Sequence, residues 1–337
     1  MSSIRRIRSL DNTWQTLDPF IFSVHHLDHF PAGNDRMRPS TGTAGRTIGQ
    51  DFSGKDGWSM YHGQAIPGFP YHPHRGFETI TVVEQGVADH SDSLGSTGRF
   101  GQGDVQWMTA GKGVQHSEMF PLIHQDKPNT LELFQIWLNL PKKSKMANAD
   151  YQMMWGEDIP IVTTHDSNGH KTTVKVIAGQ YQRHVALAPP LNSWAADPDN
   201  HLAIWLIRMD PNTDWVLPKA VAELNRSIYM YQGDTLEVDR QTVRNYHAID
   251  LVSDVDVRIS SGEEKVSMLL LQGRPINEKV VQYGPFVMNS EEEIEQAYQE
   301  YRRTQFGGWP WPTREHVHPA DKGRFALYPD GTIEERG

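Results

Sequence analysis

Cysteine is absent from all 337 residues of the chain. This absence excludes disulfide bonds, thiolate zinc sites, thiol nucleophiles and cysteine-ligated iron–sulfur clusters. A metal ion bound by this chain must therefore use nitrogen and oxygen ligands.

Long apolar runs are lacking too. No run approaches the ~18 residues that a membrane-spanning helix needs, and no apolar stretch follows the arginines of the N-terminal MSSIRRIRSLDNTW. We therefore expect no membrane span, no secretory signal and a cytoplasmic location. Lys and Arg form no dense block and the formal net charge is −10, so direct nucleic-acid binding is not expected.

Short apolar or alternating runs, separated by Gly, Pro, Asp and Asn, dominate the sequence. This pattern is typical of all-β sandwiches and barrels. The predicted strands include 77–84, 104–108, 130–140, 172–178, 202–209, 227–231 and 265–271. The length allows two ordinary domains, and the interruption at 141–148 marks a soft boundary between them.

One helix is expected near the end of the chain, where Ser290 and the glutamates after it fit a capping box. The apolar residues that follow at helical spacing are Ile294, Ala297, Tyr298 and Tyr301. Residues 307–337 are rich in Pro, Gly and charge, which indicates an extended surface tail. We interpret His316 and His318 in this tail as a surface pair rather than a second metal site.

Two short motifs carry the densest chemistry, namely His72-Pro-His74 and, further along, His116-Ser-Glu118. In an extended strand, residues i and i+2 point to the same face. Two such strands facing each other across a barrel would bring three nitrogen atoms and one oxygen atom together. The sequence therefore predicts a metal site, against the alternative of histidines with ordinary hydrogen bonds.

The oxygen ligand is ambiguous at this level. Glu78 shares strand parity with His72 and His74, so periodicity does not choose between Glu78 and Glu118. Pro73 weakens the parity argument further, since proline belongs at the start or the edge of a strand.

Several longer runs are distinctive, namely His72-Pro-His-Arg-Gly-Phe-Glu-Thr79, Asp89-His-Ser-Asp-Ser-Leu-Gly95, Gly103-Asp-Val-Gln-Trp-Met-Thr-Ala-Gly111, His116-Ser-Glu-Met119 and Gly284-Pro-Phe-Val-Met-Asn289. With these runs the chain resembles the pirin family of bicupins, over about residues 17–306. The resemblance implies an all-β fold of two cupin (jelly-roll) barrels in tandem, followed by a helix and an extended tail. The implied domains are a metal-binding barrel over 1–145, a barrel without a metal site over 146–287, and the helix and tail over 288–337.

The same resemblance implies that His72, His74, His116 and Glu118 are the ligands of one divalent ion and that Glu78 is structural. Iron(II) is the expected ion, with nickel, manganese, cobalt or zinc as other occupants. Some family members resemble quercetin 2,3-dioxygenases. We therefore expect a dioxygenase that cleaves a flavonol with O2, with Glu118 also acting as the catalytic base.

Two other functions are compatible with the same motifs. The protein could be a non-enzymatic, iron-dependent redox sensor or regulator that acts through protein partners, or a cupin in which the metal only stabilises the barrel. The apolar residues around the motifs, Phe77, Trp107, Met108, Met119 and Phe120, are interpreted as barrel core more readily than as walls of a phenolic-ligand site. The histidines at 25, 26 and 29 are expected to be exposed or in a loop.

Overall fold

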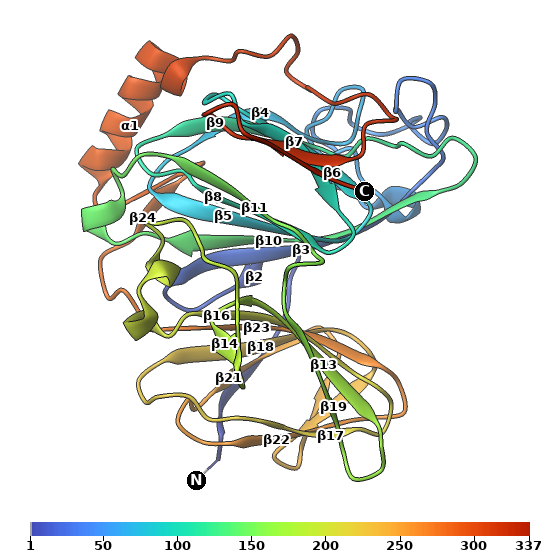
Figure 1. Cartoon of the computed structure of the whole chain (residues 1–337), viewed down its shortest axis with the longest axis vertical. Coiled ribbons are helices and arrows are strands. Elements are labelled where there is room, and N and C mark those ends of the chain that lie inside the picture. The colour runs from blue at the N-terminus through green and yellow to red at the C-terminus, as the bar shows by residue number, and fades with distance from the viewer. Residues whose placement is uncertain (1) are drawn as a thin grey trace. The chain divides into compact units, whose positions relative to one another are not determined.

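The computed structural model describes residues 2–337 and consists mainly of antiparallel strands (Figure 1). The chain divides into two compact units. Unit 1 contains the residues up to Val24, Trp137–Asn139 and Glu157–Asn277, and unit 2 contains His25–Ile136, Leu140–Gly156 and Glu278–Gly337. Each unit therefore combines distant parts of the chain, and the contiguous ranges 1–145, 146–287 and 288–337 remain a proposal.

Unit 1 contains a seven-stranded and a four-stranded sheet. The larger has the order β1 (Ile4–Ser9), β21 (His247–Leu251), β18 (Asn225–Gln232), β23 (Val266–Gly273), β16 (Ala203–Met209), β13 (Lys171–Ala178), β12 (Ile161–His165). The smaller has the order β17 (Asp214–Leu217), β22 (Val257–Ser261), β19 (Thr235–Val238), β20 (Gln241–Arg244). Alternate residues such as Val174 and Val176 point inward and join one apolar core with residues of both sheets. A hairpin of β14 (Gln180–Tyr181) and β15 (His184–Val185) follows β13.

Two six-stranded sheets contain most strands of unit 2. One has the order β11 (Asp150–Met154), β8 (Asp104–Thr109), β5 (Phe77–Gln85), β10 (Asn129–Asn139), β3 (Phe20–Phe30), β2 (Trp14–Gln15), in which β2, the start of β3 and the end of β10 belong to unit 1. The other has the order β27 (Ile333–Arg336), β26 (Arg324–Leu327), β7 (Thr97–Gly101), β6 (Val87–Asp92), β9 (Val114–Met119), β4 (Gly68–His74). Short 3-10 helices lie in the connections of both units: η1 (Lys55–Gly57) and η2 (Lys142–Ser144) in unit 2, and η3 (Trp194–Ala196) and η4 (Pro198–Asn200) in unit 1.

The predicted helix is confirmed as α1 (Glu291–Thr304), preceded by the hairpin of β24 (Val281–Tyr283) and β25 (Phe286–Met288) and followed by η5 (Gln305–Gly307). The Ser290 side chain accepts a hydrogen bond from the Glu293 N–H, as expected of an N-cap. Ile294 and Ala297 are buried against β25. No helix of residues 2–337 combines the length and apolar character needed to cross a bilayer.

The tail is extended, but the interpretation of His318 as a surface residue was wrong. Strand β26 pairs with β7, and His318 is buried. The reason is the buried ion pair of Arg99 with Asp89: Arg99 donates to the His318 carbonyl, and Asp89 accepts from the His318 N–H. Buried charged groups are stable only when they have hydrogen-bond partners. The bonds from Arg99 and Asp89 to the His318 backbone therefore hold the tail against the sheet.

The expectation for the histidines at 25, 26 and 29 was wrong in part. All three lie in strand β3, and only His29 is exposed. A ring nitrogen of His25 bonds the Glu132 carboxylate, and Nδ1 of His26 bonds the Tyr61 hydroxyl.

Candidate metal centre

Strands β4 and β9 bring the two histidine motifs together as antiparallel neighbours in one sheet. The expectation that these strands face each other across the barrel was therefore wrong. His72 lies opposite His116, and Pro73 lies opposite Gln115. Strand β4 is at the edge of its sheet, which is where a proline can be accommodated because the edge does not need its missing N–H. The doubt that Pro73 raised about strand parity is thereby removed.

The three imidazoles converge inside unit 2. One ligand atom from each of His72, His74 and His116 lies within 4.8 Å of the others, and no other group of three or more potential ligands gathers in this way among residues 2–337. The ring centroids are 4.7 Å apart for His72 and His74, 4.5 Å for His72 and His116, and 4.9 Å for His74 and His116.

Backbone carbonyls orient two of the rings. Nδ1 of His72 lies 3.0 Å from the Pro70 carbonyl oxygen, and Nδ1 of His74 lies 3.4 Å from that of Pro285. Donation from Nδ1 selects the tautomer whose Nε2 carries the lone pair, as is usual for histidines that bind metals. His116 is fully buried, and neither of its ring nitrogens has a hydrogen-bond partner in the described chain.

The three rings are uncharged at neutral pH. Burial lowers the pKa of His72 to about 4. Burial, reinforced by neighbouring imidazoles, holds the pKa values of His74 and His116 well below the usual range. Metal ions bind the neutral form of histidine, so this environment suits a metal and disfavours a charged cluster.

Glu118 lies beside this group, with Oε2 3.8 Å from Nε2 of His116. Its Oε1 accepts a 2.7 Å hydrogen bond from the Thr81 hydroxyl, and Nε2 of Gln135 lies 3.4 Å from Oε2. Burial raises the pKa of the Glu118 carboxyl, although the Thr81 bond opposes this rise. The donor set consists of three neutral imidazole nitrogens and an adjacent carboxylate, and one of the imidazoles has no hydrogen-bond partner in the described chain. This set fits a divalent first-row ion.

Glu78, the rival oxygen ligand, is engaged elsewhere. It accepts hydrogen bonds from the Trp107 ring N–H at 3.2 Å and the Thr109 hydroxyl at 2.7 Å. Glu78 and Thr81 differ in parity along β5, so they point to opposite faces of the sheet. Thr81 reaches Glu118, and Glu78 therefore faces away from that carboxylate.

Sequence reasoning missed several polar residues of this centre, including Thr81 and Gln135, which both contact Glu118. His90 also lies here, with its ring centroid 5.4 Å from that of His116 and a ring nitrogen 3.2 Å from the Asp92 carboxylate. Its position opposite Glu118 in the pairing of β6 with β9 explains the proximity. The available signal was the unbroken run of four polar residues at 89–92 in a predicted β protein.

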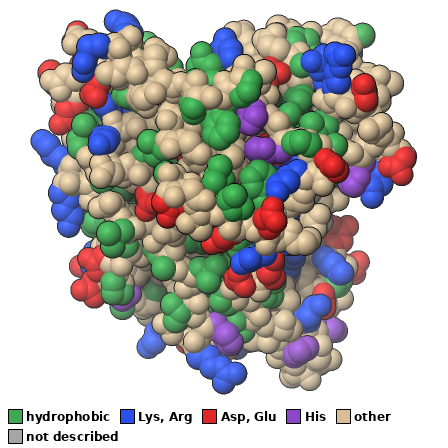
Figure 2. Space-filling model, turned by 45° about the horizontal axis from the view of Figure 1, so that its top comes forward, with side chains coloured by type: hydrophobic (Ala, Val, Ile, Leu, Met, Phe, Trp, Pro, Cys, Tyr) green, Lys and Arg blue, Asp and Glu red, His purple; other side chains and the backbone are tan. Residues whose placement is uncertain are grey.

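Aromatic side chains lie beside the centre. On the face of the molecule in Figure 2, some histidine side chains lie next to hydrophobic ones. The Phe69 ring is 6.3 Å from that of His72 and stacks on Tyr61 at 5.1 Å. Phe52 contacts Tyr61 edge-on and is 55% exposed, so part of this aromatic group is open to solvent. The five apolar residues interpreted as barrel core, Phe77, Trp107, Met108, Met119 and Phe120, are all buried.

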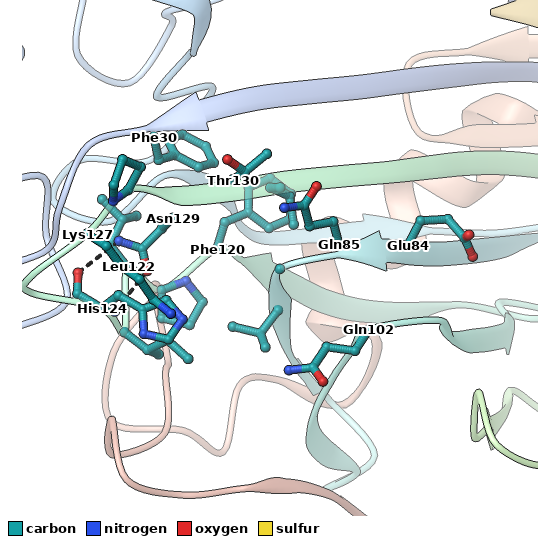
Figure 3. A pocket seen from close by; sticks show the side chains of 16 residues that line it. Phe30, Glu84, Gln85, Gln102, Phe120, Leu122, His124, Lys127, Asn129 and Thr130 are labelled. Atoms are coloured by element: carbon teal, nitrogen blue, oxygen red, sulfur yellow. Dashed lines mark hydrogen bonds between the residues drawn. The ribbon is translucent and has the colours of Figure 1, made fainter. Parts of the chain in front are cut away.

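A cavity of about 500 Å³ lies in another part of unit 2 (Figure 3). Its lining includes Phe30, Gln102, Phe120, His124 and Lys127. None of the three clustered histidines, nor Glu118, contributes to this lining. The cavity is therefore distinct from the candidate metal centre.

Two antiparallel barrel units, one with an apolar interior and one with three converging imidazoles, define a bicupin with a candidate divalent-metal centre. The chain belongs to the pirin family, because residues 2–138 match the Pirin model and residues 204–307 match the model of the Pirin C-terminal cupin domain. The predicted family and fold class are thus confirmed.

Individual relatives agree with this assignment. The chain is 38% identical over 71% of its length to a Pseudomonas aeruginosa protein provisionally named quercetin 2,3-dioxygenase, covering 79% of that protein. It is 34% identical to human pirin, over 71% of this chain and 78% of pirin. A crystal structure of quercetin 2,3-dioxygenase from Acinetobacter baumannii superposes with a TM-score of 0.71 at 25% identity, covering 91% of this chain and 99% of that one.

Proposed function

We propose that this protein is a metal-dependent dioxygenase that opens the heterocycle of a quercetin-like flavonol with O2. The observation that carries the proposal is the convergence of three buried, neutral imidazoles beside the Glu118 carboxylate. The names of the Pseudomonas and Acinetobacter relatives support the choice of substrate.

In this proposal His72, His74, His116 and Glu118 hold one divalent ion, with iron(II) preferred over nickel, manganese, cobalt or zinc. The bound ion would supply Lewis acidity and a template for the flavonol oxygen and O2. The carbonyls of Pro70 and Pro285 keep two imidazoles in the tautomer that ligation needs.

Glu118 has a second proposed task, which is to accept the proton of the flavonol 3-hydroxyl. Because burial raises the pKa of this carboxyl, it takes up a proton more readily than an exposed carboxylate does. The ring of Phe69, 6.3 Å from that of His72, is the proposed contact for an aromatic ring of the flavonol.

The proposal is tested by elemental analysis together with quercetin absorbance and oxygen uptake, for wild type and His116→Ala. The wild-type protein should contain about one ion per chain. In air it should consume quercetin and O2 in equal amounts, and without air it should leave quercetin unchanged. In His116→Ala, metal content and turnover should fall by more than about 100-fold, beyond the range typical of residues that only support ligands.

His124→Ala is the matched control, since His124 lines the separate cavity, and it should keep both properties. Full activity in His116→Ala would contradict the proposed site. A wild type that binds the ion but consumes neither quercetin nor O2 would instead favour the sensor or regulator function.

A further inference from the structure

A hydrogen-bonded group of Thr81, Gln135 and Glu118 spans the interior of unit 2. Thr81 is on β5 and Gln135 on the neighbouring strand β10, whereas Glu118 is on β9 of the other sheet. The Thr81 hydroxyl lies 2.7 Å from Oε1 of Glu118 and 2.7 Å from Oε1 of Gln135, and it has one proton, which the carboxylate accepts. The bond from Thr81 to Glu118 therefore connects the two sheets next to His116, whose Nε2 lies 3.8 Å from Oε2 of Glu118.

We propose that Thr81, assisted by Gln135, is a positioning residue that keeps Oε1 of Glu118 in the barrel interior and turns Oε2 toward the imidazoles. This inference rests on the metal centre of the proposed function. The distances support it, because Oε1 is held at 2.7 Å by Thr81 while Oε2 is the oxygen 3.8 Å from Nε2 of His116.

The physical reason lies in the freedom of a glutamate side chain. Glu118 has three rotatable bonds, and a carboxylate can offer one oxygen or both to an ion. A hydrogen bond to one oxygen from a rigid strand residue removes much of that freedom, and charge-assisted bonds of this kind are among the stronger ones. Thr81 is 1% exposed, so water does not readily replace its hydroxyl.

Thr79 provides a matched control within the same strand. It lies two residues from Thr81, so both point to the same face of β5. Thr79 is fully buried, and its hydroxyl has no hydrogen-bond partner in the described chain. Thr79→Val therefore removes a neighbouring hydroxyl without removing a bond to Glu118.

The test uses Co(II) as the probe, added to the metal-free full-length protein. Its dissociation constant and its visible ligand-field spectrum are measured for wild type, Thr81→Val, Thr81→Ser and Thr79→Val. In Thr81→Val we expect binding weaker by about 10- to 100-fold, the range found for residues that support metal ligands, and a changed spectrum. Thr81→Ser and Thr79→Val should resemble wild type.

The melting temperatures of the metal-free variants distinguish a positioning role of Thr81 from a purely structural one. A purely structural role would lower the melting temperature of Thr81→Val without a specific change in the Co(II) spectrum. Gln135→Leu serves as a second variant, with a smaller change in the same direction. Wild-type affinity and spectrum in Thr81→Val would overturn the inference. If the wild-type protein failed to bind Co(II), both the metal centre and this inference would be overturned. If it bound Co(II) tightly but its iron form did not turn over quercetin, only the proposed reaction would be overturned.

Discussion

At the scale of single residues, His116 shows why the centre suits a cation. Its ring is fully buried and both nitrogens lack hydrogen-bond partners in the described chain. Leaving a buried polar atom unpaired costs about 1–3 kcal/mol. A ligand atom supplied from outside the chain would offset that cost, so metal binding and folding of unit 2 should reinforce each other.

Arg46 and Asp51 form a buried ion pair in the loop before β4. The Arg46 side chain is fully buried, donates to Oδ2 of Asp51 at 2.8 Å, and packs 3.5 Å from the Trp58 ring centroid. Burial alone would raise the pKa of Asp51, but hydrogen bonds from Ser53, Met60 and Arg46 outweigh it and lower this pKa to about 2.

We predict that Asp51→Asn lowers the free energy of unfolding by about 2 kcal/mol at pH 7, because Arg46 would stay buried without an opposite charge. The depressed pKa means that the carboxylate stabilises the fold above its ordinary value of 3.8, and that this contribution is lost as the pH falls toward 2. The difference between wild type and variant in urea unfolding should therefore shrink over that interval.

Asp56→Asn is the control, because Asp56 is 3.9 Å from Arg46 and its side chain is 63% exposed. Exposed pairs contribute about 0–1 kcal/mol, so this variant should unfold almost as wild type does. A difference for Asp51→Asn that does not change with pH would contradict the assigned role of the charge.

At the scale of elements, the segment that contains β25 packs against the turn between β4 and β5. The Val287 N–H donates to the Arg75 carbonyl, and Nζ of buried Lys145 donates to the carbonyls of Gly76 and Val287. Arg75 also forms a 2.9 Å ion pair with Glu300 of α1. Because this turn directly follows His74, the segment supports the candidate metal centre.

Gly76 is required where these backbones meet. Its φ is +86°, and a Cβ added there would lie 2.0 Å from the Val287 carbonyl oxygen. We predict that Gly76→Ala destabilises the protein by about 2–3 kcal/mol or more, through backbone strain and displacement of β25. It should also weaken Co(II) binding, since the Pro285 carbonyl that orients His74 is next to β25.

Gly95→Ala is the comparison for this prediction, measured by denaturant unfolding. Gly95 has a similar φ of +92° but no atom within 4 Å of an added Cβ. It should therefore show the backbone strain without the displacement. Equal effects of the two substitutions would indicate that packing of β25 does not depend on Gly76.

At the scale of the whole molecule, each unit is completed by a segment from the far end of the chain. Strand β1, near the N-terminus, pairs with β21 in unit 1. The residues after Asn277, including α1 and β26, belong to unit 2. Because all four proposed ligands are in unit 2, the stabilisation that a bound ion provides should be concentrated there.

Hydrogen exchange with and without Co(II) tests this distribution. We expect added protection in β4, β9 and residues 285–308, because these segments hold the proposed ligands or support them. Strands β16 and β23 of unit 1 should change little. Equal protection of β16 and β23 would show that the ion acts on the chain as a whole.

The sequence by itself determined which side chains are available to bind a metal and most of the local structure of this protein. Without cysteine, a metal site requires histidine and carboxylate, and the spacing in His72-Pro-His74 and His116-Ser-Glu118 placed such candidate ligands in pairs. The alternating runs predicted the strands, and Ser290 marked the start of α1. These features depend on residues a few positions apart, which is the range over which a pattern is informative.

Only the tertiary structure decided which distant groups meet. It placed the His116 ring beside that of His72, the Thr81 hydroxyl against Glu118, and His318 on the ion pair of Arg99 with Asp89. Each of these arrangements joins residues brought together by sheet pairing and barrel closure. The physical reason is that a periodic pattern specifies which side of a strand a residue faces, whereas its neighbours across the barrel follow from how the strands pair and pack.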